Sequence, residues 1–350
     1  MPILNIATFA SATVMGAQRY EEAIAERAAG ALEEIEPGWA VRRTIVRSMR
    51  SDLAGNRRLP MDRVSSGSVV LRRSAARLIY PRGALTHRMT VRLPPSPYGD
   101  VLTLHDVTPW THTDELTAPR AAAEEIRRAD AVITVSEFSA SQIEERFGVT
   151  AHVIPNGIDE RMLTASRLPS ATLAGLGLEG RYVLTAGGAS GRKNLEGLAA
   201  AWARLESQYP DTFLALAGPE HPRRTELFAD LPRVVLLGRV ADDVLPGVYA
   251  GAAAVVVPSL YEGFGIPALE GMAVGVPVVA SNTTSLPEVV GDGGILVDPS
   301  PQGLAQGIEF ALSGDAQVDA IARRGRERAA EYTWDRAAAS HAQLWSRLGA

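Results

Sequence analysis

The chain has 350 residues, of which 46% are hydrophobic and 21% charged, a composition typical of a globular protein and not of a disordered or fibrous one. It contains no cysteine, which excludes disulfide bonds and thiolate metal sites. No stretch approaches the roughly 20 consecutive apolar residues of a membrane-spanning helix, and the apolar N-terminus lacks the basic segment of a signal peptide. We therefore expect a cytoplasmic protein, long enough for two domains.

The formal net charge of −5 conceals an uneven distribution. Residues 41–92 contain 13 arginines and two aspartates, a charge of +11, so the remainder carries −16. Such a stretch suits anionic lipid headgroups or a phosphorylated acceptor. Nucleic acid is not an expected partner, because only Trp39 and Tyr80 offer stacking surfaces there and the rest of the chain is acidic. The alternative is a solvated surface whose arginines pair with acids from elsewhere.

Short apolar runs alternate along the chain with longer amphipathic stretches. The runs do not alternate in polarity, which is typical of strands buried on both faces, and their alternation with helices predicts parallel βαβ units. The expected strands are 3–10, 101–106, 131–136, 152–157, 182–188, 212–218, 234–238, 254–259 and 277–281, with helices over 17–35, 137–148 and 194–209.

The predicted fold class is α/β, with two doubly wound parallel-sheet domains. We expect an N-terminal domain over 1–166, a flexible Gly- and Ser-rich linker over 167–180 and a C-terminal domain over 181–335. A final helix over 336–350 is expected to fold back across the domains.

Lys193 is the only lysine among 35 basic residues. It lies in "AGGASGRKNLEG", directly after the predicted strand 182–188, where glycines let the backbone turn and Asn194 can cap the next helix. Ligands of an open parallel sheet bind beyond the carboxyl ends of its strands. Arg192 and Lys193 are therefore candidates for binding a diphosphate, since a compact ammonium fits between two phosphates where a planar guanidinium does not. The alternative is a surface lysine without function.

The segment "VVVPSLYEGFGIPALEGMAVGVPVVAS" joins two predicted strands through a glycine-rich turn and a helix with Pro267 in its first turn. Glu262 precedes this helix and Glu270 lies eight residues later, within it. Because this spacing does not put them on one helical face, the two carboxylates fit the hydroxyl groups of two different sugars of one ligand. Either residue alone would be an ordinary helix acid.

"EGFGIPALE" resembles the E-x7-E motif of retaining family 4 glycosyltransferases, which have the GT-B fold of two Rossmann-like domains facing a cleft. "SGRKN" is similar to the basic pair that these enzymes place on the donor diphosphate. "TLHD", "ADAVITVSEFSASQI", "VIPNGID" and "VVASNTTSLPEVVGDGGILVDP" extend the resemblance from about Val101 to the C-terminus. In the N-terminal part, the family's glycine-rich loop has its counterpart only in "SATVMGA", with Gly16.

The resemblance implies a role for each matching residue. Arg192 and Lys193 would neutralise the diphosphate leaving group, Glu262 would hold the donor sugar and Glu270 the ribose. His105 would face the donor sugar from the other domain. The implied catalytic residues are His105 and Glu262, and the implied donor-binding residues are Gly16, Arg192, Lys193, Val240, Gly263, Phe264, Gly265, Ile266 and Glu270. Asn156 and Gly157 resemble hinge residues.

The resemblance implies transfer of a hexose, with retention, from a nucleotide diphosphate sugar to a glycan or lipid-linked acceptor. GDP-mannose is the favoured donor, since the segment from "LHDVTPW" to "VSEFSASQI" most resembles bacterial mannosyltransferases of surface polysaccharides. We expect no metal or other cofactor, because cations and amides meet the phosphate charge. The arginine-rich stretch 41–92 would dock the enzyme on the inner face of the cell membrane. A glycoside phosphorylase or sugar-phosphate synthase, and a non-catalytic nucleotide-sugar binding module, remain alternatives.

Overall fold

The computed structural model describes residues 1–11, 16–112, 114 and 117–349. The chain forms two compact units, each with its own parallel sheet: Met1–Gly157 together with the residues from Trp334 on, and Ile158–Thr333. The chain passes from the first unit to the second directly after Asn156 and Gly157. The fold class and the return of the last helix to the first unit are confirmed, although the unit boundaries differ from the predicted ones.

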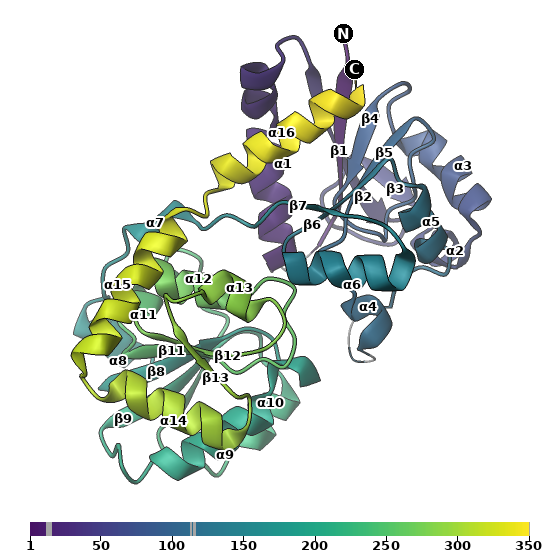
Figure 1. Ribbon diagram of the computed structural model, residues 1–350. Helices are drawn as coiled ribbons and strands as arrows, with labels where there is room; N and C mark the ends of the chain where they lie inside the picture. The colour runs from purple at the N-terminus through teal and green to yellow at the C-terminus, as the bar shows by residue number, and fades with distance from the viewer. Residues whose placement is uncertain (12–15, 113, 115–116, 350) are drawn as a thin grey trace. The chain divides into compact units, whose positions relative to one another are not determined.

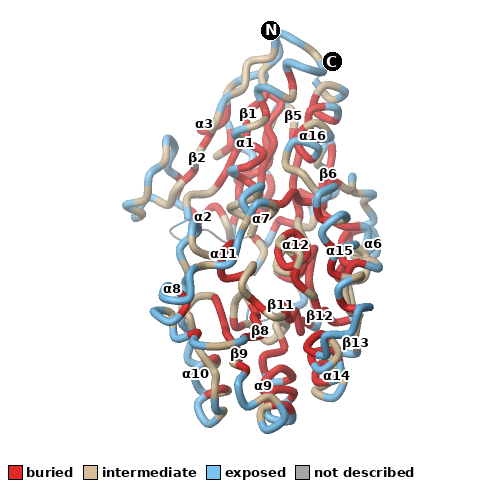
Figure 2. The backbone as a smooth tube through the Cα atoms, turned by 90° about the vertical axis from the view of Figure 1, so that its left-hand side faces the viewer, coloured by how far each residue is buried: buried red, intermediate tan, exposed pale blue. Residues whose placement is uncertain are grey.

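The first unit contains a seven-stranded parallel sheet in the order β3-β2-β1-β4-β5-β6-β7. Its strands are β1 (Ile3–Phe9), β2 (Ala40–Ser48), β3 (Arg57–Leu59), β4 (Leu85–Arg88), β5 (Gly99–Thr103), β6 (Ala131–Thr134) and β7 (His152–Val153). Its helices are α1 (Gly16–Ile35), α2 (Met61–Ser66), α3 (Val69–Ile79), α4 (Thr108–Thr111), α5 (Ala122–Arg128), α6 (Glu137–Phe147) and α16 (Trp334–Gly349). The central strands are buried on both faces (Figure 2).

Helix α16 packs along α1 (Figure 1), and a chain of buried polar groups joins it to the sheet. Tyr20 of α1 lies 2.7 Å from His341 Nε2 and 2.9 Å from Thr103 of β5, and His87 Nε2 of β4 lies 2.8 Å from the same threonine. His341 Nδ1 faces the carbonyl of Ala337, so it must donate and Nε2 must accept from Tyr20. Burial lowers the pKa of both His87 and His341, so both rings are neutral.

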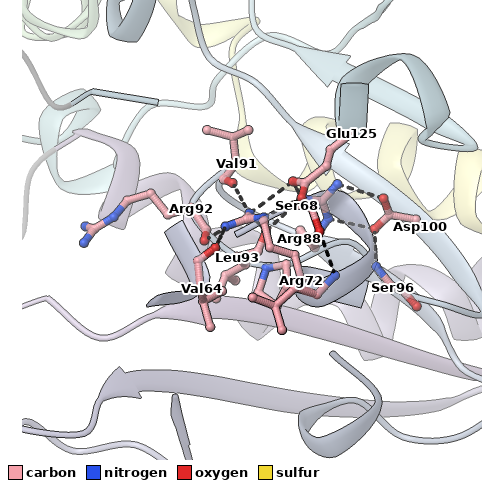
Figure 3. A network of polar contacts seen from close by, with 12 residues as sticks. Val64, Ser68, Arg72, Arg88, Val91, Arg92, Leu93, Ser96, Asp100 and Glu125 are labelled. Atoms are coloured by element: carbon pink, nitrogen blue, oxygen red, sulfur yellow. Dashed lines mark hydrogen bonds and ion pairs between the residues drawn. The ribbon is translucent and has the colours of Figure 1, made fainter. Parts of the chain in front are cut away.

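Strands β4 and β5 are parallel neighbours joined by a ten-residue crossover without a helix. Its buried carbonyls need donors, and two buried arginines supply them (Figure 3). Arg72 donates to the carbonyls of Val91 (3.1 Å) and Leu93 (3.0 Å), and Arg88 donates to Leu93 (2.9 Å). Glu125 pairs with Arg72, while Asp100 takes two 2.7 Å hydrogen bonds from Arg88.

The second unit contains a six-stranded parallel sheet in the order β10-β9-β8-β11-β12-β13. Its strands are β8 (Arg181–Ala186), β9 (Thr212–Ala217), β10 (Val234–Gly238), β11 (Ala254–Val257), β12 (Val278–Ser281) and β13 (Ile295–Val297). Its helices are α7 (Glu160–Leu163), α8 (Ser170–Gly175), α9 (Leu195–Leu205), α10 (Pro222–Phe228), α11 (Leu245–Ala250), α12 (Ile266–Ala273), α13 (Leu286–Val290), α14 (Pro301–Leu312) and α15 (Ala316–Ala330).

Helices cover both faces of the second sheet. Trp202 and Leu198 of α9 and Leu304 and Ile308 of α14 form one apolar layer against the strands, and α12 packs against α15 on β11 and β12. The strand order reverses between β8 and β11, and this reversal is the point at which doubly wound sheets bind their ligands.

Two expectations need correction. The predicted linker 167–180 is a packed part of the second unit: it contains α8 and buries Leu173 and Leu178. The arginine-rich stretch is not one basic surface, because Arg72 and Arg88 are fully buried and Arg43 is paired with Glu22. The remaining exposed arginines include Arg73 and Arg77, on α3.

Candidate functional site

A pocket lies at the carboxyl ends of β8, β9 and β11, at the reversal point of the second sheet. It is lined by Thr185, Ala186, Gly187, Gly188, Lys193, Leu195, Ala217, Arg224, Val257, Pro258 and Ser259. The single lysine of the chain therefore borders the place where ligands of this architecture bind.

The predicted diphosphate cations and the predicted sugar carboxylate form one cluster. Lys193 Nζ lies 2.7 Å from Glu262 Oε1, and Arg192 Nη1 lies 3.2 Å from Glu262 Oε2. The exposed fractions of the Lys193 and Arg192 side chains are 15% and 17%. Among these three side chains, two cations share one carboxylate.

Glu262 is held from several directions. Ser259 donates to Glu262 Oε1 at 2.7 Å, the Glu262 amide donates to Thr284 at 3.1 Å, and Ser285 donates to the Glu262 carbonyl at 2.9 Å. Burial alone would raise the pKa of Glu262, but Lys193 and Arg192 together lower it by more, so the pKa lies below its usual range. The carboxylate is thus ionised and fixed.

Asn194 joins the two loops that carry the cluster. It adopts a left-handed backbone (φ 52°) and caps α9, accepting a 3.2 Å hydrogen bond from the Gly197 amide, as the sequence predicts. Its side-chain amide donates to the carbonyls of Pro258 (2.9 Å) and Pro299 (2.8 Å). The Leu260 amide donates to the Arg192 carbonyl at 2.7 Å. The basic pair and Glu262 are therefore held in register by backbone contacts.

The turn after Glu262 leads directly into α12. Gly265 has φ 105°, and a Cβ there would meet Leu286 at 2.7 Å, so this position requires glycine. Ile266 opens the helix and Pro267 occupies its first turn, as predicted. Phe264 is buried and packs edge-on against Tyr332, with ring centroids 5.8 Å apart, so its side chain is structural and any contact of Phe264 with a ligand would be through its backbone.

The other predicted donor residues of this unit lie outside the cluster. Glu270 lies within α12 and is buried. Val240 is half-buried in the loop between β10 and α11. Neither residue lines the pocket, so their assignment to the ribose and the base stays a prediction.

His105 belongs to the first unit and follows β5. Its ring packs edge-on against Tyr20, with ring centroids 4.7 Å apart. Its Nε2 is buried without a hydrogen-bond partner in the described chain, and burial lowers its pKa. Asp106, its neighbour, accepts from Thr108 at the start of α4. His105 is thus a neutral imidazole with one nitrogen available.

Gly16 is the first residue of α1. Residues 12–15 of the predicted "SATVMGA" loop lie outside the described residues, so the expected N-terminal contact to the donor stays a prediction.

Sequence reasoning missed Ser259, Thr284, Ser285 and Arg224 as parts of the site. Ser259 ends the predicted strand 254–259, and Thr284 and Ser285 follow the predicted strand 277–281. Their place at strand ends was the available signal. Arg224 gave no signal, because it lies inside a helix.

Within the described residues, no group of three or more His, Asp or Glu side chains is arranged to hold a metal ion. In the same part of the chain, no helix has both the length and the apolar composition needed to cross a bilayer.

Two family models match the chain. Residues 180–313 match the model described as "Glycosyl transferases group 1", and residues 47–161 match "Glycosyltransferase Family 4". Among curated proteins, the O-antigen chain mannosyltransferase B of Escherichia coli is 34% identical over 255 residues, which are 67% of each chain. The serotype-specific mannosyltransferase WbdA of E. coli is 27% identical over 285 residues; the match covers 74% of this chain but only 35% of WbdA.

Solved structures share the fold at lower identity. HepE of Anabaena, in complex with UDP-glucose, superposes with a TM-score of 0.76 at 20% identity, covering 99% of this chain and 100% of HepE. Sucrose-phosphate synthase of Thermosynechococcus elongatus superposes with a TM-score of 0.75 at 22% identity, covering 99% of both chains.

Proposed function

The chain belongs to the family 4 glycosyltransferases and has the GT-B fold, and we propose that it transfers mannose from GDP-mannose to a glycan or lipid-linked acceptor. The observation that carries this proposal is the cluster of Arg192, Lys193 and Glu262 at the reversal point of the second sheet. The similarity to mannosyltransferases supports mannose as the sugar.

The cluster has the charge that departure of a diphosphate requires. When the bond between the sugar and the phosphate breaks, negative charge grows on the phosphate oxygens, and preorganised cations stabilise it. Arg192 and Lys193 would supply this charge without a metal ion. Glu262 would keep the ammonium in place and accept hydrogen bonds from the donor sugar.

The remaining roles follow the family resemblance. Glu270 would accept hydrogen bonds from the ribose hydroxyls, Val240 would lie near the base and His105 would face the donor sugar. The product would keep the anomeric configuration of the donor.

The proposal is tested by nucleoside diphosphate release from UDP-, GDP-, ADP- and dTDP-sugars in EDTA, with wild type, Lys193→Arg and Glu262→Gln. The expected result is slow release from GDP-mannose that falls about a hundredfold in both variants. Arg204→Gln, an exposed change on α9, should release at the wild-type rate.

Other outcomes would redirect the assignment. Nucleoside diphosphate release from a different sugar nucleotide would identify that compound as the donor in place of GDP-mannose. Release only after a divalent cation is added would overturn metal independence. Turnover that requires free phosphate would favour a phosphorylase. Binding of a donor without turnover, in the presence of a mannan acceptor, would favour a non-catalytic module.

We also propose that α3 contacts anionic lipid. Val70, Leu71 and Leu78 have exposed fractions of 73%, 52% and 79%, and Arg73 and Arg77 are exposed on the same helix. Apolar side chains flanked by arginines suit an interface with acidic headgroups.

Flotation with vesicles tests this contact. Wild type should float with vesicles containing phosphatidylglycerol and not with phosphatidylcholine alone. Arg73→Glu/Arg77→Glu should abolish flotation, and the matched pair Arg204→Glu/Arg323→Glu, exposed in the second unit, should not. Equal flotation with both lipids would refute the proposal.

A further inference from the structure

Arg224, on α10, is a second cation of the pocket that the roles above leave unused. It is 3% exposed and lines the pocket together with Lys193 and Ser259. Within the described residues, its guanidinium donates only to carbonyls: Gly187 (2.6 Å), Pro219 (2.8 Å) and Gly188 (3.2 Å). Its Nε is buried without a partner in the described chain.

The charge of Arg224 is not neutralised within the described residues. Burial lowers its pKa, and no neighbouring carboxylate raises it. A buried charge is costly unless polar groups or a counterion compensate it. Carbonyl dipoles supply part of this compensation here, and an anion in the pocket would supply the rest.

The contacts of Arg224 also determine which polar groups of the loop after β8 are occupied. Its neighbour Arg223 donates to the Ala189 carbonyl at 3.1 Å, so the carbonyls of residues 187–189 are all occupied by arginines. Among the described residues, the amides of residues 188–190 bond to no backbone carbonyl. A Cβ placed on Gly188 would meet nothing within 4 Å, so the loop is open on that side. Successive backbone amides with no protein acceptor form an anion-binding concavity.

We propose that Arg224 is a positioning residue for the donor diphosphate: it holds the carbonyls of Gly187 and Gly188, leaves the neighbouring amides to the phosphates and adds an uncompensated positive charge to the pocket. This inference rests on the proposed function. Arg192 and Lys193 then bind one side of the diphosphate and the amides of residues 188–190 bind the other.

The two functions of Arg224 can be separated by substitution. Arg224→Lys keeps the charge but loses the planar fork that reaches three carbonyls, whereas Arg224→Met loses both. Arg233→Met is the matched control. Arg233 is half-buried, donates to the Glu206 carbonyl and has a buried Nε without a partner in the described chain, but it precedes β10, at the opposite end of the sheet.

Calorimetric titration of the full chain with GDP and with inorganic pyrophosphate tests the proposal. Arg224→Met should bind both about tenfold more weakly or worse, because the lost contacts concern the phosphates alone. Arg224→Lys should be intermediate, and Arg233→Met should bind as wild type even where it unfolds at a lower temperature.

Wild-type affinity in both Arg224 variants would overturn the inference and leave the proposed function intact. An equal loss of affinity in Arg233→Met would also overturn it, because the effect would then be general destabilisation. Wild type that binds neither GDP nor pyrophosphate would overturn the proposed function and this inference together. If Arg224→Met does not fold, Arg224→Lys alone decides, with wild-type affinity refuting the role of the fork.

Discussion

Each unit contains a cluster of basic and acidic side chains, and the two clusters differ in charge balance and in access to solvent. In the first unit, Arg72 and Arg88 face Glu125 and Asp100, so the charges cancel, and both arginine side chains are 0% exposed. In the second unit, the two cations Lys193 and Arg192 pair with the one carboxylate of Glu262 and are partly exposed. A balanced, closed cluster holds the fold together, whereas an unbalanced cluster beside a pocket can bind an anion.

The largest effect is expected from breaking the closed cluster. Glu125→Gln leaves Arg72 charged in the interior without its carboxylate, and loss of one partner of a buried pair lowers the free energy of unfolding by about 3–5 kcal/mol. Urea unfolding measures the change. Arg72→Met/Glu125→Leu, which removes both charges, should lose less; an equal or larger loss would show that the carbonyl contacts of Arg72 matter more than its charge.

Acid should destabilise the first unit through its buried histidines. The pKa of His341 is lowered by burial to about 4, against about 6.5 in an unfolded chain. Above pH 6.5 the neutral His341 makes its full contribution to the free energy of unfolding. This contribution, about 3 kcal/mol, is lost as the pH falls toward 4. Glu21 acts in the opposite direction, since burial raises its pKa to about 8.

The contribution of His341 is therefore measured as a difference between wild type and His341→Gln. Hydrogen exchange of α16 and β5 at pH 7 and pH 5 should show a smaller acid-induced loss in the variant. The second unit should respond only below about pH 4.5, where carboxylates such as Glu262 take up protons. Parallel loss in the variant would mean that folding does not lower the pKa of His341.

Breaking the open cluster should change stability less. The side chain of Glu262 is 8% exposed and those of Arg192 and Lys193 are 17% and 15% exposed, so in Glu262→Gln the free energy of unfolding should fall by less than in Glu125→Gln. Turnover should fall about a hundredfold. A stability loss as large as that of Glu125→Gln would show that the open cluster is structural too.

The smallest effect is expected at an exposed pair of the same chemistry. The Arg43 and Glu22 side chains are 35% and 51% exposed. A double-mutant cycle should give a coupling of about 0.5 kcal/mol or less, which disappears in 1 M salt. A salt-independent coupling above this value would contradict the assignment of the pair to the solvated surface.

The sequence predicts the second unit better than the first. Its strands are continuous apolar runs, and Arg192, Lys193 and Glu262 each follow such a run, so the rule that ligands bind beyond the carboxyl ends of parallel strands is enough to place all three at one edge of the sheet. Their direct pairing was not predictable, because it depends on how the loops after β8 and β11 pack.

In the first unit, the same reasoning fails at two places. Strand β4, "LTHR", is wholly buried although three of its four residues are polar, so it has no apolar signal. Arg72 resembles the exposed arginines around it, because its partner Glu125 lies 53 residues away. A buried arginine differs from a solvated one only in its tertiary partners.

The return of α16 to the first unit has a consequence for synthesis on the ribosome. The second unit is one uninterrupted segment and can fold as soon as it emerges. The first unit lacks a helix of its own core until α16 is synthesised, after the whole second unit, and the Tyr20–His341 hydrogen bond spans 321 positions. Contacts of such sequence separation form slowly. The half of the molecule that is translated first is therefore the half that is completed last, and until then the face of α1 that α16 covers is open to chaperones.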